Sequence, residues 1–286
     1  MSSNRPTPIR VDLEIGDQLT SISCGHIVVE LIKFMSYQRL QIPYKYQWLK
    51  SIVNKKSSDT SSNQESYRSE THFRTVSTAL SNLDFILKSL MQEVSGPSMP
   101  EEICIIYGSI PASGKEVYRI LLPSTCHKPQ CHSKNIASDQ KIQQNVFRNL
   151  VTNEALSEVF FKPLLPTNMY VFLKKKAKNK QNELVNIDNF ELTSGCRLPR
   201  NSKVIVLDLR THNLDKVSCC NNFQIFGDIT ENFVNLEINH DDKDVEEFIE
   251  IESTDTMTWY QSTYVMKGFK DCIVNGESIT NAWLDS

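Results

Sequence analysis

Long apolar runs are missing from this sequence. No stretch approaches the roughly 18 consecutive apolar residues of a membrane-spanning helix, so no such helix is expected. The first residues, Met-Ser-Ser-Asn-Arg-Pro, lack the apolar core of a secretory signal. We therefore expect the eight cysteines to be reduced thiols in the cytosol, the nucleus or both.

The sequence also lacks an excess of either charge. Lys and Arg number 31 against 34 Asp and Glu, which gives a net charge of −3. Nucleic-acid-binding domains are usually basic, so no nucleic-acid partner is expected. The one basic run, Lys174–Lys180, is more typical of a solvated hairpin tip than of a nuclear-import or acidic-partner patch.

Catalytic motifs are absent as well. The sequence has no serine nucleophile elbow, no HExxH motif and no paired-carboxylate motif. Gly108–Lys115 has the look of a phosphate-binding loop, but one residue too many separates its glycines. Glu116 also stands where a hydroxyl should bind magnesium. A hairpin turn explains this segment better, and no nucleotide is expected.

Possible zinc ligands occur in one cysteine- and histidine-bearing loop. Cys126-His127 and Cys131-His132 lie close together, and Cys219-Cys220 could add a second arm. Zinc sites usually combine two well-separated pairs, and adjacent side chains diverge. We therefore expect no metal, no cofactor and no enzymatic activity, with a nucleotide-binding or zinc enzyme as the alternative from another class.

The sequence does contain periodic apolar segments, which change from helical to strand-like along the chain. Helical spacing predicts helices at Cys24–Arg39, Tyr44–Val53, 72–94 and 139–161. Helices first and strands later indicate an α+β fold. Short apolar runs predict strands at Ile103–Tyr107, Val117–Leu122, Tyr170–Leu173, Lys203–Leu209, Phe223–Phe226, Phe233–Ile238 and Met257–Met266.

One domain is expected to hold most of the 286 residues. Residues 1–20 are polar and predict an N-terminal tail or a loose first strand, and residues 21–271 form the domain. Within it, the Ser- and Thr-rich segment 55–71 predicts a flexible loop. Residues 272–286 form a C-terminal tail, whose Trp283 and Leu284 are apolar enough to dock, for example on the sheet edge.

Two residues do not fit a simple core pattern. In the 139–161 helix, Phe147 and Val151 fall beside the apolar stripe, so Phe147 is either a second core contact or a partner-binding anchor. Gln38 lies on the stripe of the first helix, where an unpaired buried amide would cost about 1–3 kcal/mol. Its amide must therefore bond inside the domain or meet a partner. The stripe of the 139–161 helix consists of Ile142, Val146, Leu150 and Phe160.

Several segments resemble the Mad-two-binding protein family, the comet proteins. The resemblance runs from about residue 22 to residue 271 in the family's order. It implies a HORMA-like fold, with three helices packed on a mainly antiparallel β-sheet and a C-terminal safety-belt-like segment. The segments are ELIKFMSYQRLQIP and WLK within Cys24–Lys50, QNVFRNLVTNEALSEV at Gln144–Val159, CRLPRNSKVIVLDL at Cys196–Leu209 and YVMKGFKD at Tyr264–Asp271.

The resemblance implies an adaptor that silences the spindle assembly checkpoint. Such proteins bind closed Mad-two, chiefly through the third helix, and present it to a hexameric AAA+ ATPase, the pachytene-checkpoint remodeller. The ATPase then takes the mitotic checkpoint complex apart. The resemblance also implies a location in the nucleus and cytoplasm, and at the spindle or kinetochore in mitosis.

The resemblance further implies where the partners bind. It places Mad-two contacts at Gln38 and Phe147, which favours the interface alternative for Phe147. Arg148, Val151 and Glu154 join them by helical adjacency. The family's ATPase contact carries Pro-Lys, and Leu192-Thr193 align there instead, which puts this contact in question. A different HORMA protein, which traps a peptide under its own safety belt, is the alternative.

Overall fold

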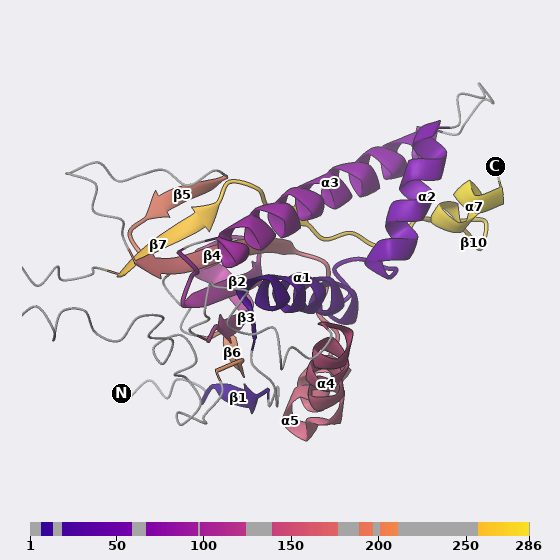
Figure 1. The fold of residues 1–286 in the computed structure, drawn as a ribbon. Helices are drawn as coiled ribbons and strands as arrows, with labels where there is room; N and C mark the ends of the chain where they lie inside the picture. The colour runs from indigo at the N-terminus through magenta and orange to yellow at the C-terminus, as the bar shows by residue number, and fades with distance from the viewer. Residues whose placement is uncertain are drawn as a thin grey trace, which may run out of the picture.

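The protein is an eight-stranded sheet with helices packed on one face. It is described by a computed structural model that covers residues 7–13, 19–58, 67–96, 98–123, 139–176, 189–196, 201–210 and 257–285. In Figure 1 helices α1 and α3 lie over the sheet, and α4 and α5 lie at one end of it. The helices are α1 (Ser21–Gln38), α2 (Tyr46–Ser58), α3 (Tyr67–Ser95), α4 (Asp139–Thr152), α5 (Glu154–Phe161) and α7 (Ile279–Asp285).

The sheet is centred on β2 and is mainly antiparallel. Its order is β1-β6-β3-β2-β4-β7-β5, with β8 also paired to β4. Among the described strands, only the β1–β6 and β3–β6 pairs are parallel. A separate hairpin joins β9 (Ile273–Val274) to β10 (Glu277–Ser278). The sheet strands are β1 (Ile9–Asp12), β2 (Glu102–Gly108), β3 (Gly114–Leu121), β4 (Asn168–Lys176), β5 (Phe190–Thr193), β6 (Lys203–Asp208), β7 (Met257–Ser262) and β8 (Met266–Lys267).

The two faces of β2 belong to different cores, because successive side chains of a strand point to opposite faces. Ile103, Ile105 and Tyr107 join the large core that the helices cover. Cys104 and Ile106 join a small cluster of sheet residues on the other face. The helices therefore cover one face of the sheet, as the α+β prediction requires.

Helices α1 and α3 pack closely because a glycine sits at their contact. A Cβ atom built on Gly25 would lie 2.7 Å from Sδ of Met91, which is closer than such atoms approach. The buried stripe of α1 includes Ile27 and Leu31, as its periodicity predicts. The helix begins at Thr20, whose side chain accepts a hydrogen bond from the backbone N–H of Ser23.

Three local predictions need correction. The segment 139–161 is not one helix, because Asn153 ends α4 and caps α5 by accepting a hydrogen bond from the Leu156 N–H at 3.0 Å. The predicted loop 55–71 is helical at both ends, since α2 continues to Ser58 and α3 begins at Tyr67. Trp283 docks on α3 rather than on a sheet edge, and its indole N–H donates to Ser69 Oγ at 3.1 Å.

Other predictions are confirmed or lie beyond what the structure describes. The segment Gly108–Lys115 is the turn of the β2–β3 hairpin, with a short 3-10 helix at Pro111–Ser113. The predicted strands Phe223–Phe226 and Phe233–Ile238 lie outside the described residues. So do the possible zinc ligands Cys126-His127, Cys131-His132 and Cys219-Cys220. Within the described ranges, no helix is long and apolar enough to cross a membrane.

Candidate partner-binding surface

An aromatic cluster joins α1 to α4 and α5. The ring of Phe34 meets Phe147 edge to face, with centroids 5.4 Å apart, and meets Phe160 at 5.8 Å. All three rings are half-buried against the main core. Phe147 is therefore partly buried. Its ring packs on Phe34, and part of the residue is accessible to solvent.

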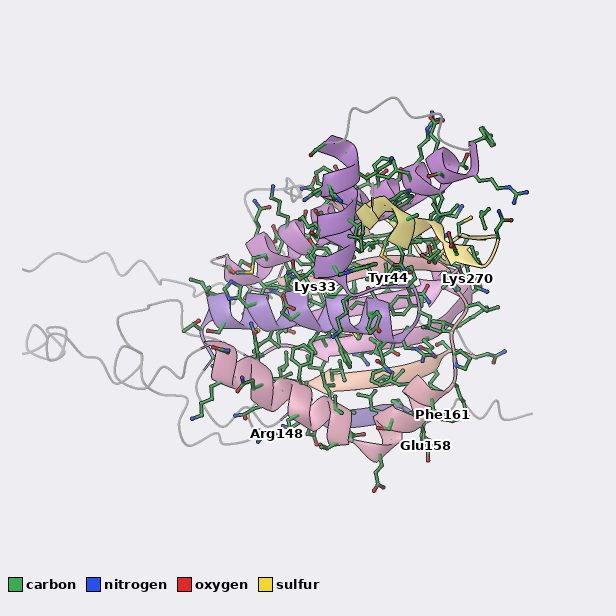
Figure 2. All side chains as sticks on the ribbon, turned by 90° about the vertical axis from the view of Figure 1, so that its right-hand side faces the viewer. Lys33, Tyr44, Arg148, Glu158, Phe161 and Lys270 are labelled. Atoms are coloured by element: carbon green, nitrogen blue, oxygen red, sulfur yellow. The ribbon has the colours of Figure 1, made fainter. Side chains whose placement is uncertain are left out.

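The outer face of α4 is exposed beside this cluster. Val151, one helical turn after Phe147, is 63% exposed, which is high for a branched apolar side chain. Arg148 is exposed on the same helix, and Figure 2 shows it at the edge of the molecule. The opposite face of α4 is anchored by Ile142, Val146 and Leu150, which are buried as the stripe predicts.

Gln38 is the last residue of α1 and lies one turn after Phe34. Its side chain is half-buried, and no residue in the described ranges hydrogen-bonds its amide. The neighbouring Tyr37 is 36% exposed. We call Phe34, Gln38, Phe147 and Val151 the α1–α4 surface. It combines apolar rings with one polar amide that can still accept a partner's hydrogen bond.

Glu154 stands apart from this grouping. Helical adjacency joined it to Val151, but the helix breaks between them at Asn153, and Glu154 opens the first turn of α5. Its side chain is exposed. Because the two residues belong to different helices, their spacing in the sequence no longer places them on one face.

A buried ion pair fixes the end of α1, directly after Gln38. Arg39, which is 1% exposed, donates to both oxygens of Glu116 on β3, at 2.9 and 2.6 Å. The same guanidinium donates to the backbone carbonyls of Val159 at 3.0 Å and Lys162 at 2.8 Å. The end of α1, strand β3 and the end of α5 are thereby tied through one side chain.

Leu192 and Thr193 lie far from this surface. They form the end of edge strand β5, where they pair with Tyr260 and Trp259 of β7. Leu192 is 40% exposed. In Figure 1 β5 lies at the end of the molecule away from α4 and α5. The structure therefore brings Gln38, Phe147 and Val151 together and leaves Leu192 and Thr193 as a separate exposed edge.

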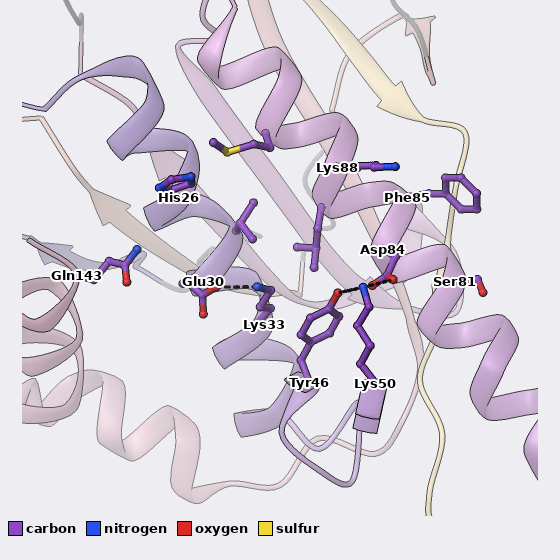
Figure 3. A pocket seen from close by; sticks show the side chains of 13 residues that line it. His26, Glu30, Lys33, Tyr46, Lys50, Ser81, Asp84, Phe85, Lys88 and Gln143 are labelled. Atoms are coloured by element: carbon purple, nitrogen blue, oxygen red, sulfur yellow. Dashed lines mark hydrogen bonds and ion pairs between the residues drawn. The ribbon is translucent and has the colours of Figure 1, made fainter. Parts of the chain in front are cut away.

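A cavity of about 700 Å³ opens between α1 and α3. Figure 3 shows that its charged side chains are largely paired with one another. Lys33 donates to Glu30 at 2.6 Å, and Lys50 donates to Asp84 at 2.7 Å. The hydrogen bond to Asp84 raises the pKa of Lys50, so this amine stays charged. Lys33 and Lys50 are therefore both engaged by carboxylates of the cavity itself.

Metal ligands do not gather in the part of the chain that the structure describes. No group of three or more His, Cys, Asp or Glu side chains there could hold an ion. The described cysteines are Cys24, Cys104, Cys196 and Cys272, and all four are free thiols.

The family of the chain follows from comparison with known proteins. The model of the p31comet family, described as Mad1 and Cdc20-bound-Mad2 binding, matches residues 5–182. That range covers more than half of the 286 residues. The chain belongs to the p31comet family. The resemblance to the comet proteins is thus confirmed, and with it Mad2 (Mad-two) binding in the spindle checkpoint. No curated protein matches the chain.

The residues that match the p31comet family include the whole α1–α4 surface. Gln38, Phe147 and Val151 all fall within residues 5–182, whereas Leu192 and Thr193 fall outside them. Sequence reasoning missed Phe34 as the ring that supports Phe147. Its place on the α1 stripe indicated burial, but nothing local revealed a contact 113 positions further along the chain. The ion pair of Arg39 could not be predicted either, because its partner Glu116 is also distant in the sequence.

Proposed function

We propose that this chain is an adaptor that binds the closed form of Mad2 through the α1–α4 surface. One observation carries the proposal: Phe147 is a half-buried ring that packs on Phe34 at 5.4 Å and lies one helical turn from the exposed Val151. A rigid aromatic anchor ringed by contacts that exclude water is the usual form of a binding hot spot. Gln38 would fix the register of the partner through its free amide.

We further propose that the bound Mad2 is passed to an AAA+ ATPase, so that the mitotic checkpoint complex is disassembled. The exposed edge at Leu192 and Thr193 supports a second contact, because it lies away from the α1–α4 surface and would stay open in a complex. Such a chain would act in the nucleus and cytoplasm, and at the spindle or kinetochore in mitosis.

The alternative, a HORMA protein that traps a peptide beneath its own belt, is less well supported. A trapped peptide commonly adds a strand to an open sheet edge. Here β7 and β8 of the same chain occupy the outer edge of β4, so among the described strands a peptide could add only at the terminal strands β5 or β1. We therefore favour the adaptor. A HORMA protein that traps a peptide under its own safety belt is the second proposal.

Truncating Phe147 tests the adaptor directly. We expect Phe147→Ala to weaken binding of closed Mad2 by about 30-fold or more, because removing a hot-spot aromatic costs about 2 kcal/mol or more. Binding is measured by titration calorimetry, and the melting temperature is followed in parallel. Because Phe147 also packs on Phe34, a fall of several degrees in Tm is expected, with the variant still folded.

The control removes a ring of similar size elsewhere. Tyr67 begins α3 and is 82% exposed. In Figure 1 α3 begins at the end next to α2, away from α4. Tyr67→Ala should leave Mad2 binding unchanged. If Phe147→Ala binds as tightly as the wild type, the ring is only a core residue and the assigned surface is wrong.

A further inference from the structure

Two thiols meet on the face of the sheet opposite to the described helices. Cys104 lies in the middle of β2 and is completely buried, and Cys196 follows β5 and is partly exposed. Their Sγ atoms are 3.4 Å apart, within hydrogen-bonding range for sulfur. They are 92 positions apart in the sequence, so the fold itself brings them together.

We propose that Cys104 and Cys196 are a modification site, a dithiol that closes to a disulfide under peroxide and fastens the β5–β6 connection to the sheet. A disulfide needs an S–S distance of about 2.05 Å, so the sulfurs must approach by only about 1.4 Å. Cys196 lies three residues past the end of β5, so no strand pairing among the described residues holds it in place.

The surroundings favour one order of reaction. Cys104 stands opposite Arg119 in the β2–β3 register, which places a guanidinium near the pair. The hydrogen bond with Cys104 lowers the pKa of Cys196, while burial and the charge of Glu102, which is paired with Arg119, oppose that change. The pKa of Cys104 is raised by the same hydrogen bond and by burial. Because Cys196 is partly exposed and Cys104 is buried, peroxide reaches Cys196 first, and Cys104 resolves it.

The chemistry balances with hydrogen peroxide as the oxidant. The Cys196 thiolate attacks one peroxide oxygen, the O–O bond breaks, and a sulfenic acid and hydroxide form. The Cys104 sulfur then attacks the sulfenic sulfur, the S–S bond forms, the S–O bond breaks, and water leaves with the thiol proton. In total, two thiols and one peroxide give one disulfide and two waters.

The cross-link would act on the edge of the sheet that carries β5. Cys196 is three positions past Thr193, so the disulfide would restrict the end of β5. The α1–α4 surface lies on the helical layer, beyond the sheet from Cys104. Oxidation should therefore change the stability and mobility of the β5 edge and leave Mad2 binding unchanged.

The test uses the full chain in which Cys126, Cys131, Cys219, Cys220 and Cys272 are all changed to Ser. This leaves Cys24, Cys104 and Cys196. After mild peroxide treatment, alkylation and peptide mass spectrometry should find one cross-linked Cys104–Cys196 peptide. Tm should rise by roughly 5 °C or more, since the cross-link restrains the unfolded chain. Cys24 is a matched control, because burial raises the pKa of this thiol to about 12, and it should remain alkylatable after unfolding.

Adding Cys196→Ser must abolish both the cross-link and the rise in Tm. The wild-type chain, treated in the same way, should yield the same cross-linked peptide. The proposal is overturned if Cys196 ends as a sulfinic acid with Cys104 still reduced. It is also overturned if Cys196 of the wild type pairs with a different cysteine, or if Tm rises equally in the Cys196→Ser variant.

Discussion

Among single residues, Arg39 joins three elements of the fold through one buried side chain. Its buried guanidinium joins Glu116 and the carbonyls at the end of α5. Tyr118 also donates to Glu116, at 3.0 Å. Removing one partner of a buried ion pair leaves the other charge unsatisfied, which costs more than the pair itself contributes.

Glu116→Gln keeps the shape of this site and removes the negative charge. We expect a loss of about 3–5 kcal/mol in the free energy of unfolding, because the Arg39 charge stays buried without its counter-ion. Urea denaturation measures the change. The control is Glu30→Gln, which breaks the more exposed pair with Lys33 and should cost less than about 1 kcal/mol. Equal losses in the two variants would show that Arg39 does not organise this region.

The ionised carboxylate of Asp208 stabilises the fold near neutral pH, and this stabilisation is lost in acid. Burial opposes its charge, but hydrogen bonds from Arg210 and the charges of Arg210 and Arg10 lower the pKa of Asp208 to about 2. Since the folded pKa lies below the unfolded value of about 3.9, the carboxylate stabilises the fold above about pH 4. That contribution is lost as pH falls towards 2.

Asp208→Asn should therefore reduce stability by about 1–2 kcal/mol at pH 7, a modest loss because both arginines are half-exposed. The gap between variant and wild type should close between about pH 5 and pH 2. Urea denaturation at a series of pH values measures it. A gap that stays constant over this range would mean that the carboxylate does not titrate as described.

The sequence alone could not show whether the ring of Phe147 is buried or exposed. Helical periodicity says only that the residue sits beside the α4 stripe. Whether the ring is covered depends on Phe34, a distant residue on another helix. The resemblance to the comet proteins selected the interface alternative. The half-buried ring agrees with that choice without testing it.

Helices with a strong apolar period could be predicted from the sequence, whereas interrupted or very short helices could not. The predicted helices at Cys24–Arg39 and 72–94 agree with α1 and with most of α3. The break at Asn153 was missed because buried residues occur on both sides of it, with Leu150 before and Leu156 after. The short helix α7 was missed because its 7 residues are too few to show a helical period. Trp283 is its largest buried anchor, beside the buried Ile279 and Thr280.

That anchor makes α7 a testable part of the fold. Trp283 is 3% exposed and packs against His72 and Phe73, with ring centroids 5.4 Å away in each case. We expect Trp283→Ala to cost about 3–5 kcal/mol, as for other buried aromatics, and thermal denaturation measures the loss. Leu284→Ala, next to it but 39% exposed, should change little. Similar losses in both variants would contradict the anchoring role.

At the scale of the whole molecule, the composition and order of elements predicted the α+β class, but not the strand order. Strand β1 pairs with β6 almost 200 residues later, and β7 lies between β4 and β5. Such pairings depend on long-range contacts that no local pattern encodes. The consequence for function is spatial: the α1–α4 surface and the β5 edge are separate, so one partner can be held while another approaches.

The most direct measurement is titration calorimetry of closed and open Mad2 against the wild type and Val151→Arg. Val151 is exposed, so the substitution should leave Tm within about 2 °C, while a charged side chain enters the proposed contact. We expect the wild type to bind closed Mad2 only, and the variant to bind it at least about 30-fold more weakly. Tyr67→Arg should bind as the wild type does. Undiminished binding by Val151→Arg would contradict the account, because Mad2 would then dock elsewhere.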